Sequence, residues 1–242
     1  MNIIVLQHIK IEDPGFIKDL MLADNVNLTT IELDEGEKIP NDLTKFDGMF
    51  CMGGPMDTYM ESEHPWLVDE KKKIKEFVVD LKKPYLGFCL GCQLLGEVVG
   101  GKVIKSKLAE IGIMDINFSK EKNNDILFSS FPEKIKSLQW HSYEVDGLDN
   151  NKDVTILASS PVTKYQIFKY KNHAYGIQFH IEIKDTTVNE WGCVPEYKQA
   201  LEDQLGEGAL DTFDQAAKDN MQSMNDYSRI LYSNFRDKII SK

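Results

Sequence analysis

The stretch that decides the fold runs from Pro84 to Gln93 and reads Pro-Tyr-Leu-Gly-Phe-Cys-Leu-Gly-Cys-Gln. Its first five residues form a predicted strand that leads directly into Cys89, and the mostly apolar segment Leu90–Val99 then predicts a helix. A thiol at such a turn lies at the carboxyl edge of a sheet, where the free N–H groups and the positive dipole end of the helix favour the thiolate. Small residues at Gly87 and Gly91 allow a tight turn and close approach of another molecule.

Upstream of this turn, apolar runs alternate with amphipathic segments. This alternation predicts an α/β domain in three layers, with a mostly parallel central sheet covered by helices on both faces. The predicted strands are 3–6, 27–33 and 47–52, and the predicted helices are 14–23 and 65–81.

Downstream, the pattern changes to short strand-like runs between polar turns, which indicates a smaller antiparallel portion of sheet. These runs are 103–104, 112–118, 155–158, 165–170 and 174–183. Beyond about Lys184 the pattern is helical again, and we expect one domain over residues 1–195 and a C-terminal helical extension, 196–242, packed on it. An apolar stripe on this extension favours core packing, with an interface left as the alternative; it consists of Met224, Tyr227, Leu231 and Phe235.

Composition narrows the function. The chain has 242 residues, with 28 Lys and Arg against 39 Asp and Glu, so its net charge is −11. Nucleic acid is therefore an unexpected partner, since its binders present basic faces and this chain has one short basic run, Lys71–Lys73. We expect no membrane partner and a cytoplasmic location, because no apolar stretch reaches the roughly 18–20 residues of a membrane span and the first residues lack the basic start of a signal peptide. Four cysteines are too few to predict a disulfide framework.

Two further motifs accompany the cysteine turn. His180 and Glu182 are two apart near the end of a predicted strand, so their side chains face the same way, and a carboxylate beside an imidazole orients it for proton transfer. Gly53-Gly54-Pro55 follows another predicted strand, and paired glycines can turn backbone N–H groups toward a developing oxyanion. Each motif alone is more often structural; together with Cys89 they indicate a nucleophile, a base and an oxyanion site.

These motifs resemble those of the class I, triad-type glutamine amidotransferases. Residues 87–93 resemble the Gly-x-Cys-x-Gly-x-Gln nucleophile elbow of that family, 53–55 its oxyanion loop, and 180–182 its His-Pro-Glu pair. The resemblance covers roughly residues 1–195 and is nearest to the stand-alone proteins similar to the glutaminase part of GMP synthetase. It implies a flavodoxin-like fold and an amidohydrolase with no metal and no cofactor.

The resemblance also implies a role for each matching residue. Cys89 would be the nucleophile, His180 the base and acid, and Glu182 the group that orients the imidazole. The N–H groups of Gly54 and Leu90 would form the oxyanion hole. The substrate would be glutamine or another γ-glutamyl compound, held by Gly53, by Gln93 and by a loop containing His141, Ser142 and Tyr143.

Two departures leave alternatives open. The usual Pro between the His and the Glu is Ile181, which restores a backbone N–H. Cys92 creates a Cys-x-x-Cys, for which we favour a packing role over a dithiol oxidoreductase. Since the chain contains no P-loop motif, a complete amidotransferase would need a synthetase partner to receive the ammonia. The main alternative is a stand-alone γ-glutamyl peptidase or amidase. His8, after the first strand, is interpreted as structural more readily than as a pocket residue.

Overall fold

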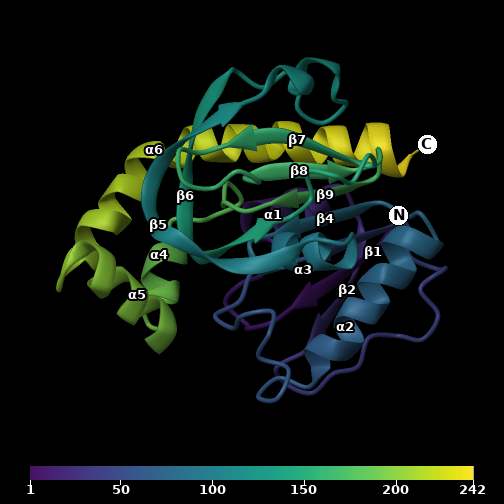
Figure 1. The fold of residues 1–242 in the computed structure, drawn as a ribbon, viewed down its shortest axis with the longest axis horizontal. Coiled ribbons are helices and arrows are strands. Elements are labelled where there is room, and N and C mark those ends of the chain that lie inside the picture. Colours follow the sequence, from purple (N-terminus) through teal and green to yellow (C-terminus); the bar gives the residue numbers. More distant parts are fainter. Residues whose placement is uncertain (242) are drawn as a thin grey trace.

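Nine strands join into one sheet in the computed structural model, which describes residues 1–241 (Figure 1). Their order across the sheet is β2-β1-β3-β4-β9-β8-β7-β5-β6. The strands are β1 (Asn2–Gln7), β2 (Asn27–Glu32), β3 (Gly48–Cys51), β4 (Tyr85–Phe88), β5 (Lys102–Phe118), β6 (Lys134–Asp146), β7 (Val154–Ser159), β8 (Ile167–Tyr170) and β9 (Ala174–Ile177).

One half of the sheet is parallel, as the alternating pattern predicted. β2, β1, β3, β4 and β9 pair in parallel, and the remaining neighbours pair antiparallel. β3, β4 and β9 are buried along their whole length, which explains their continuous apolar sequences: helices cover both faces of the sheet here. The carboxyl ends of these strands meet at one edge, where the segments after β1, β3, β4 and β9 lie together.

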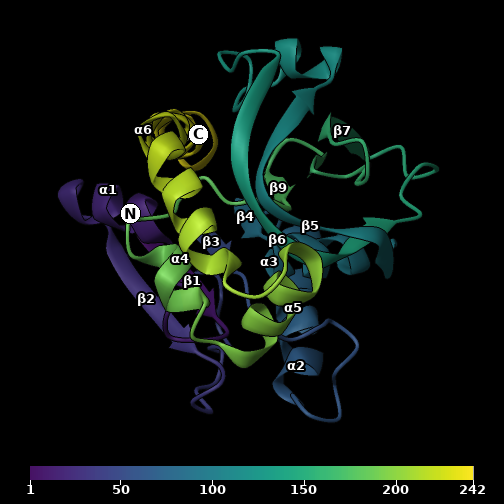
Figure 2. The same ribbon diagram turned by 90° about the vertical axis from the view of Figure 1, so that its left-hand side faces the viewer.

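Helices form the two outer layers. α1 packs beside α6 on one face of the sheet, and α2 packs beside α3 on the other (Figure 2). Two separate apolar clusters fill the spaces between these layers. The helices are α1 (Gly15–Ala23), α2 (Trp66–Lys75), α3 (Leu90–Val98), α4 (Thr187–Trp191), α5 (Pro195–Leu205) and α6 (Ala209–Asn234), with a 3₁₀ turn at Lys120–Asn124 and π-helical turns at Glu76–Asp80 and Phe235–Ile240. The three-layer, flavodoxin-like prediction is confirmed.

The antiparallel half differs in detail from its prediction. The runs 103–104 and 112–118 belong to one 17-residue strand, β5, and β6 was not predicted at all. β5 pairs with β6 along almost its whole length, with an irregularity between Lys105 and Glu110. Cross-strand hydrogen bonding, which continues through polar residues, sustains these two strands where hydrophobic periodicity does not.

The segment predicted as a single strand over 174–183 leaves the sheet early. β9 ends at Ile177, and His180 forms an isolated bridge with Leu138 of β6. The N–H of His180 donates to the carbonyl of Leu138 at 2.8 Å, and the N–H of Leu138 donates back at 3.1 Å. The premise that His180 and Glu182 share the face of a strand was therefore wrong, although their side chains do meet, as described below.

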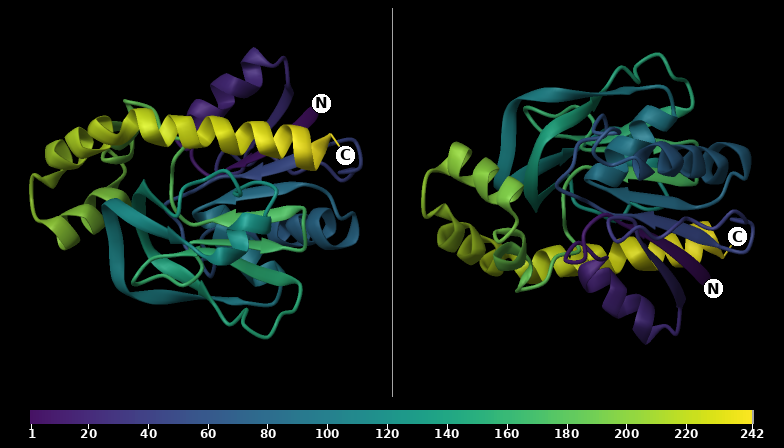
Figure 3. Two further views of the ribbon diagram at one scale, coloured as in Figure 1. Left: turned by 90° about the horizontal axis from the view of Figure 1, so that it is seen from above. Right: turned by 90° about the horizontal axis from the view of Figure 1, so that it is seen from below.

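α6 runs the length of the molecule across one face of the sheet (Figure 3). Its stripe packs into the core shared with α1 and the sheet: Met224, Leu231 and Phe235 are buried, and Tyr227 is partly buried against them. The core interpretation of the stripe is therefore confirmed. Within residues 1–241, no helix is both long and apolar enough to cross a membrane.

Candidate active site

Cys89 occupies a strained turn between β4 and α3. Its φ is 48° and its ψ is −103°, a conformation that a residue with a side chain rarely adopts. The turn is held on both sides, because the N–H of Cys89 donates to the carbonyl of Ile177 at 2.8 Å and its carbonyl accepts from the N–H of Gln93 at 3.1 Å. Strained conformations held in this way concentrate at functional sites, and a nucleophile elbow has this form.

The two glycines of the elbow are required by its packing. A Cβ atom on Gly91 would lie 2.1 Å from the carbonyl oxygen of Cys51, and one on Gly87 would lie 2.5 Å from the carbonyl oxygen of Gly91. The start of α3 therefore packs directly against the backbone of β3. This close approach places Cys89 beside the Gly53-Gly54 segment that follows β3.

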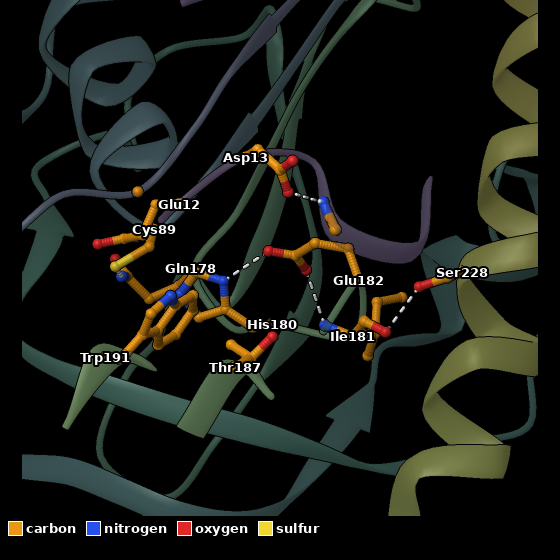
Figure 4. A network of polar contacts seen from close by, with 12 residues as sticks. Glu12, Asp13, Cys89, Gln178, His180, Ile181, Glu182, Thr187, Trp191 and Ser228 are labelled. Carbon is orange, nitrogen blue, oxygen red and sulfur yellow. Dashed lines mark hydrogen bonds and ion pairs between the residues drawn. The ribbon is translucent and has the colours of Figure 1, made fainter. Parts of the chain in front are cut away.

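His180 and Glu182 form a hydrogen-bonded pair (Figure 4). Nδ1 of His180 lies 2.6 Å from Oε1 of Glu182, and since a carboxylate accepts, Nδ1 carries the hydrogen and Nε2 is left for chemistry. The other carboxylate oxygen accepts from the N–H of Ile181 at 2.9 Å. A proline at position 181 could not donate this bond, so the departure from the family pattern adds support for Glu182.

The environment of His180 favours its charged form. The side chain is buried, which by itself lowers the pKa, but the charge of Glu182 and hydrogen bonds with Cys89 and Glu182 together hold the pKa of His180 well above its ordinary value. An imidazolium beside the Cys89 sulfur stabilises a thiolate. The amide of Gln178 also donates to Sγ of Cys89, at 3.6 Å. The three predicted residues Cys89, His180 and Glu182 therefore lie together.

The paired glycines also lie at this site. A Cβ atom on Gly53 would lie 3.4 Å from Cε1 of His180, and one on Gly54 would lie 3.1 Å from the side chain of Leu90. Leu90 is the first residue of α3, so its N–H has no acceptor within the helix. The arrangement brings the two predicted oxyanion-hole residues, Gly54 and Leu90, next to each other.

His8 holds the glycine segment in place. Its Nδ1 donates to the carbonyl of Gly53 at 2.9 Å, and its Nε2 lies 2.8 Å from Oε1 of Glu70. Burial lowers the pKa of His8, but the charge and the hydrogen bond of Glu70 and the bond to Gly53 outweigh it and raise the pKa. His8 is therefore a buried positioning residue, as its structural interpretation predicted.

His8, Glu70 and Cys51 are also the potential metal ligands that lie closest together among residues 1–241. All three are fully buried, and Oε1 of Glu70 already accepts from Cys51 at 3.4 Å as well as from His8. Burial and the charge of Glu70 raise the pKa of the Cys51 thiol well above its ordinary value, which disfavours the thiolate that binds metals. The group is satisfied by its own hydrogen bonds.

A pocket of about 180 Å³ opens at Cys89. It is lined by Asp57, Cys89, Gln93, Trp140, His141, Ser142, Tyr143, Tyr197 and Ala200. Four of the five predicted substrate-contacting residues therefore line it, whereas Gly53 lies beside His180 instead. The prediction that His141, Ser142 and Tyr143 form a loop was wrong, because they lie within β6 and their backbone is paired with β5.

Gln93 and His141 already have partners in the protein. The side-chain amide of Gln93 donates to the carbonyl of Tyr143 at 3.0 Å and to Oε1 of Gln178 at 3.3 Å. His141 lies 3.4 Å from the carboxylate of Glu110. Their first effect is to fix β6 against the elbow, and Gln93 retains only its carbonyl oxygen for a substrate.

Sequence reasoning missed three residues at the site: Glu12, Trp191 and Tyr197. Glu12 follows β1 and is 2% exposed, and the hydroxyl of Tyr197 in α5 donates to its Oε1. The ring of Trp191 packs edge-on against His180 with a centroid distance of 4.7 Å. The position of Glu12 after a strand of the parallel sheet was a usable signal, but nothing local indicated that residues of α4 and α5 return to the site.

Cys92 points away from this pocket. It is fully buried, and a Cβ atom on Gly176 of β9 would lie 2.9 Å from its sulfur. Both Cys89 and Cys92 are free thiols. Cys92 therefore packs α3 against the sheet, and the dithiol interpretation has no geometric support.

Comparison with known proteins identifies the family. The sequence profile described as glutamine amidotransferase class-I matches residues 17–190, which is well over half of the chain. The chain belongs to this family. The amidotransferase is therefore an enzyme of the glutamine amidotransferase and hydrolase type, as predicted.

Its relatives fall into more than one functional group. One subunit of a glutamine-hydrolysing GMP synthase from Picrophilus torridus is 30% identical over 70% of this chain and 81% of the relative. A protein named gamma-glutamyl peptidase 3 from Arabidopsis thaliana is 28% identical over 75% of this chain and 72% of the relative. A crystal structure of a glutamine amidotransferase from Thermotoga maritima is 27% identical, with a TM-score of 0.85 over 97% of both chains.

Proposed function

We propose that this amidotransferase hydrolyses the side-chain amide of glutamine through Cys89, His180 and Glu182. The observation that carries the proposal is the strained elbow of Cys89, which sets its thiol against an imidazole whose far nitrogen is bound by Glu182 at 2.6 Å. Nucleophile, base and orienting group are then in the order that acyl transfer requires. The raised pKa of His180 supports a thiolate–imidazolium pair as the resting form.

In the first step, Sγ of Cys89 attacks the amide carbon of glutamine. The negative charge that develops on the amide oxygen is stabilised by the N–H groups of Gly54 and Leu90. Nε2 of His180 gives its proton to the departing nitrogen, the C–N bond breaks, and ammonia leaves a γ-glutamyl thioester on Cys89.

In the second step, water attacks the thioester carbon while Nε2 of His180 accepts a proton from that water. The C–S bond breaks, glutamate leaves, and Cys89 returns to the thiolate. Glu182 stabilises the imidazolium in each direction, with its second oxygen fixed by the N–H of Ile181. All groups in this cycle belong to the chain, the substrate or water.

The test measures glutamate and ammonia released from glutamine by the purified chain. We expect equal amounts of the two products, no turnover above background in Cys89→Ala, and turnover within a few-fold of wild type in Cys92→Ala. Turnover that survives in Cys89→Ala would overturn the proposal. Equal loss in both variants would instead favour the dithiol interpretation.

We also propose that in the cell the ammonia passes to a synthetase partner. The support is the similarity to the GMP synthase relative, which is named as one subunit of a larger enzyme. The free thiols of Cys51, Cys89, Cys92 and Cys193 fit a reducing compartment, so we place the activity in the cytoplasm. The similarity to a γ-glutamyl peptidase supports a competing substrate, a γ-glutamyl peptide.

A further inference from the structure

We propose, building on the amidase function above, that Glu12, Trp191 and Tyr197 form a leaving-group compartment of the active site that is sized for ammonia. The compartment admits the primary amide of glutamine and excludes γ-glutamyl peptides, whose leaving group is an amino acid. Two of its three walls come from the chain after the His180-Glu182 pair, from α4 and α5.

The position of the leaving group follows from the chemistry of His180. A general acid must lie within hydrogen-bond reach, about 2.6–3.2 Å, of the nitrogen that it protonates. Because Nδ1 donates to Glu182, only Nε2 can make this contact. Whatever surrounds the ring of His180 therefore limits the size of the group that leaves.

That surrounding space is closed on several sides. Trp191 packs edge-on against the ring of His180, with 4.7 Å between the centroids. On another side, the position of a Cβ on Gly53 is only 2.1 Å from Oε2 of Glu12 and 3.4 Å from Cε1 of His180, so the carboxylate sits directly over the glycine beside the ring. His180 is 1% exposed and Glu12 is 2% exposed.

Tyr197 closes the compartment toward the pocket. Its hydroxyl donates to Glu12, while its side chain also lines the 180 Å³ pocket at Cys89. Its ring is braced by Trp140 at 5.6 Å and by Trp191 at 5.9 Å between centroids. Pockets that hold drug-sized ligands are about 300–1,000 Å³. The pocket here suits the glutamyl half of a substrate, without space for a second amino acid beyond Cys89.

The charge of the compartment also suits its occupant. Figure 4 shows Glu12 and Trp191 on the same side of the network as Cys89 and His180. Burial raises the pKa of Glu12 to about 7, against the opposing effects of His180, Tyr197 and His8. A carboxylate that ionises near neutral pH can accept a hydrogen bond from departing ammonia or pair with ammonium. An amino-acid leaving group would instead bring its own carboxylate against that of Glu12.

The experiment compares kcat/KM for three substrates with the same acyl group: glutamine, γ-glutamylmethylamide and γ-glutamylalanine. In wild type we expect kcat/KM to fall at least 100-fold from glutamine to γ-glutamylalanine, with the methylamide between them. Tyr197→Ala opens the compartment, and the ratio of γ-glutamylalanine to glutamine should rise at least tenfold. Tyr197→Phe keeps the bulk and should leave this ratio within about twofold.

A second measurement uses microscopic reversibility, since an acceptor amine must enter where the leaving group departs. With glutamine as donor, wild type should transfer the γ-glutamyl group to hydroxylamine but not to methionine, and Tyr197→Ala should transfer it to both. Thermal unfolding of each variant reports whether it is folded; if Tyr197→Ala is not, Tyr197→Leu replaces it.

The inference is overturned if wild type cleaves γ-glutamylalanine as efficiently as glutamine, or if the folded Tyr197→Ala protein changes both substrates equally. A different result marks failure of the underlying function: wild type would then release no Cys89-dependent glutamate from any of the three substrates. Cys89-dependent cleavage with γ-glutamylalanine preferred would retain the nucleophile and reject only the ammonia-sized compartment.

Discussion

His8 links the carbonyl of Gly53 to the carboxylate of Glu70, so one imidazole fixes the peptide group that presents the N–H of Gly54. A peptide group is planar, and holding its carbonyl therefore sets the direction of the N–H on its other side. His8 reaches no reacting atom itself. It acts on the proposed oxyanion hole through Gly53, which makes the hole dependent on a buried ion pair in the neighbouring layer.

Replacing His8 by Ala should therefore lower kcat for glutamine by at least tenfold with KM changed less than threefold. Loss of one oxyanion donor costs roughly 10²–10³ in kcat in other enzymes, and a misdirected donor should cost part of that. Steady-state kinetics measures both constants. His64→Ala is the matched control, since His64 also packs on Trp66, with ring centroids 5.4 Å apart. Equal effects of the two substitutions would contradict the positioning role.

Glu12 should make stability depend on pH. Burial raises the pKa of Glu12 from its ordinary 4.5 to about 7, with Glu182 adding to the rise and His180, Tyr197 and His8 opposing it. The folded state thus holds a proton that the unfolded state has lost, and the contribution of Glu12 to the free energy of unfolding falls as the pH rises from about 4.5 to 7.

Urea denaturation of wild type and Glu12→Gln at pH 5, 6, 7 and 8 isolates this contribution. The stability of wild type relative to Glu12→Gln should decline across pH 5–7 and change little above pH 8. A difference that stays constant with pH would show that Glu12 ionises normally.

At the scale of elements, the start of α1 supports the loop that carries Glu182. The N–H of Phe16 donates to the carbonyl of Glu182 at 2.6 Å. Gly15, at φ +51°, approaches the same carbonyl so closely that a Cβ would lie 2.0 Å from its oxygen. From α6, the hydroxyl of Ser228 donates to the carbonyl of Ile181 at 2.7 Å. Two helices distant in sequence therefore fix the loop after β9.

Gly15→Ala should destabilise the protein by at least about 1 kcal/mol more than Gly36→Ala, since overpacking typically costs about 1–3 kcal/mol. Gly36 has φ +84° with nothing within 4 Å of its Cβ position, so it reports the backbone cost alone. Urea denaturation measures the difference. Gly15→Ala should also lower glutamine turnover, because it displaces Glu182, and equal stabilities for the two variants would refute the close contact.

At the scale of the whole molecule, α6 is part of the core rather than an attachment to it. Phe235, in the π-helical turn that continues α6, packs its ring against Phe50 of β3 with centroids 5.5 Å apart. The C-terminal end of the chain thus covers the central strands of the parallel sheet.

Phe235→Ala should therefore destabilise the protein by about 3–5 kcal/mol, as loss of a buried phenylalanine typically does. Leu205→Ala, at a side chain that is 50% exposed, should change stability by less than about 0.5 kcal/mol. Thermal or urea unfolding tests both. A small effect at Phe235 would mean that the C-terminal segment can detach without unfolding the sheet.

Much of the parallel half was predictable because its signals are local. The apolar runs of β1, β3 and β4 each lie between turn signals, and the turn from β4 into α3 is written in ten consecutive residues. The antiparallel ribbon of β5 and β6 was harder, since many of its residues are polar and its stability comes from pairing with each other. Local pattern does not report such long-range pairing.

For the site, the sequence by itself determined the reactive elbow at Cys89, the glycine segment after β3 and the His180-Glu182 pair, because each is a short motif whose chemistry depends on adjacent residues. Only the tertiary structure decided that Glu12, Trp191 and Tyr197 enclose His180 and that His8 holds Gly53. Those contacts join segments up to 185 positions apart, and the packing of the sheet and helices, rather than any local spacing, brings them together.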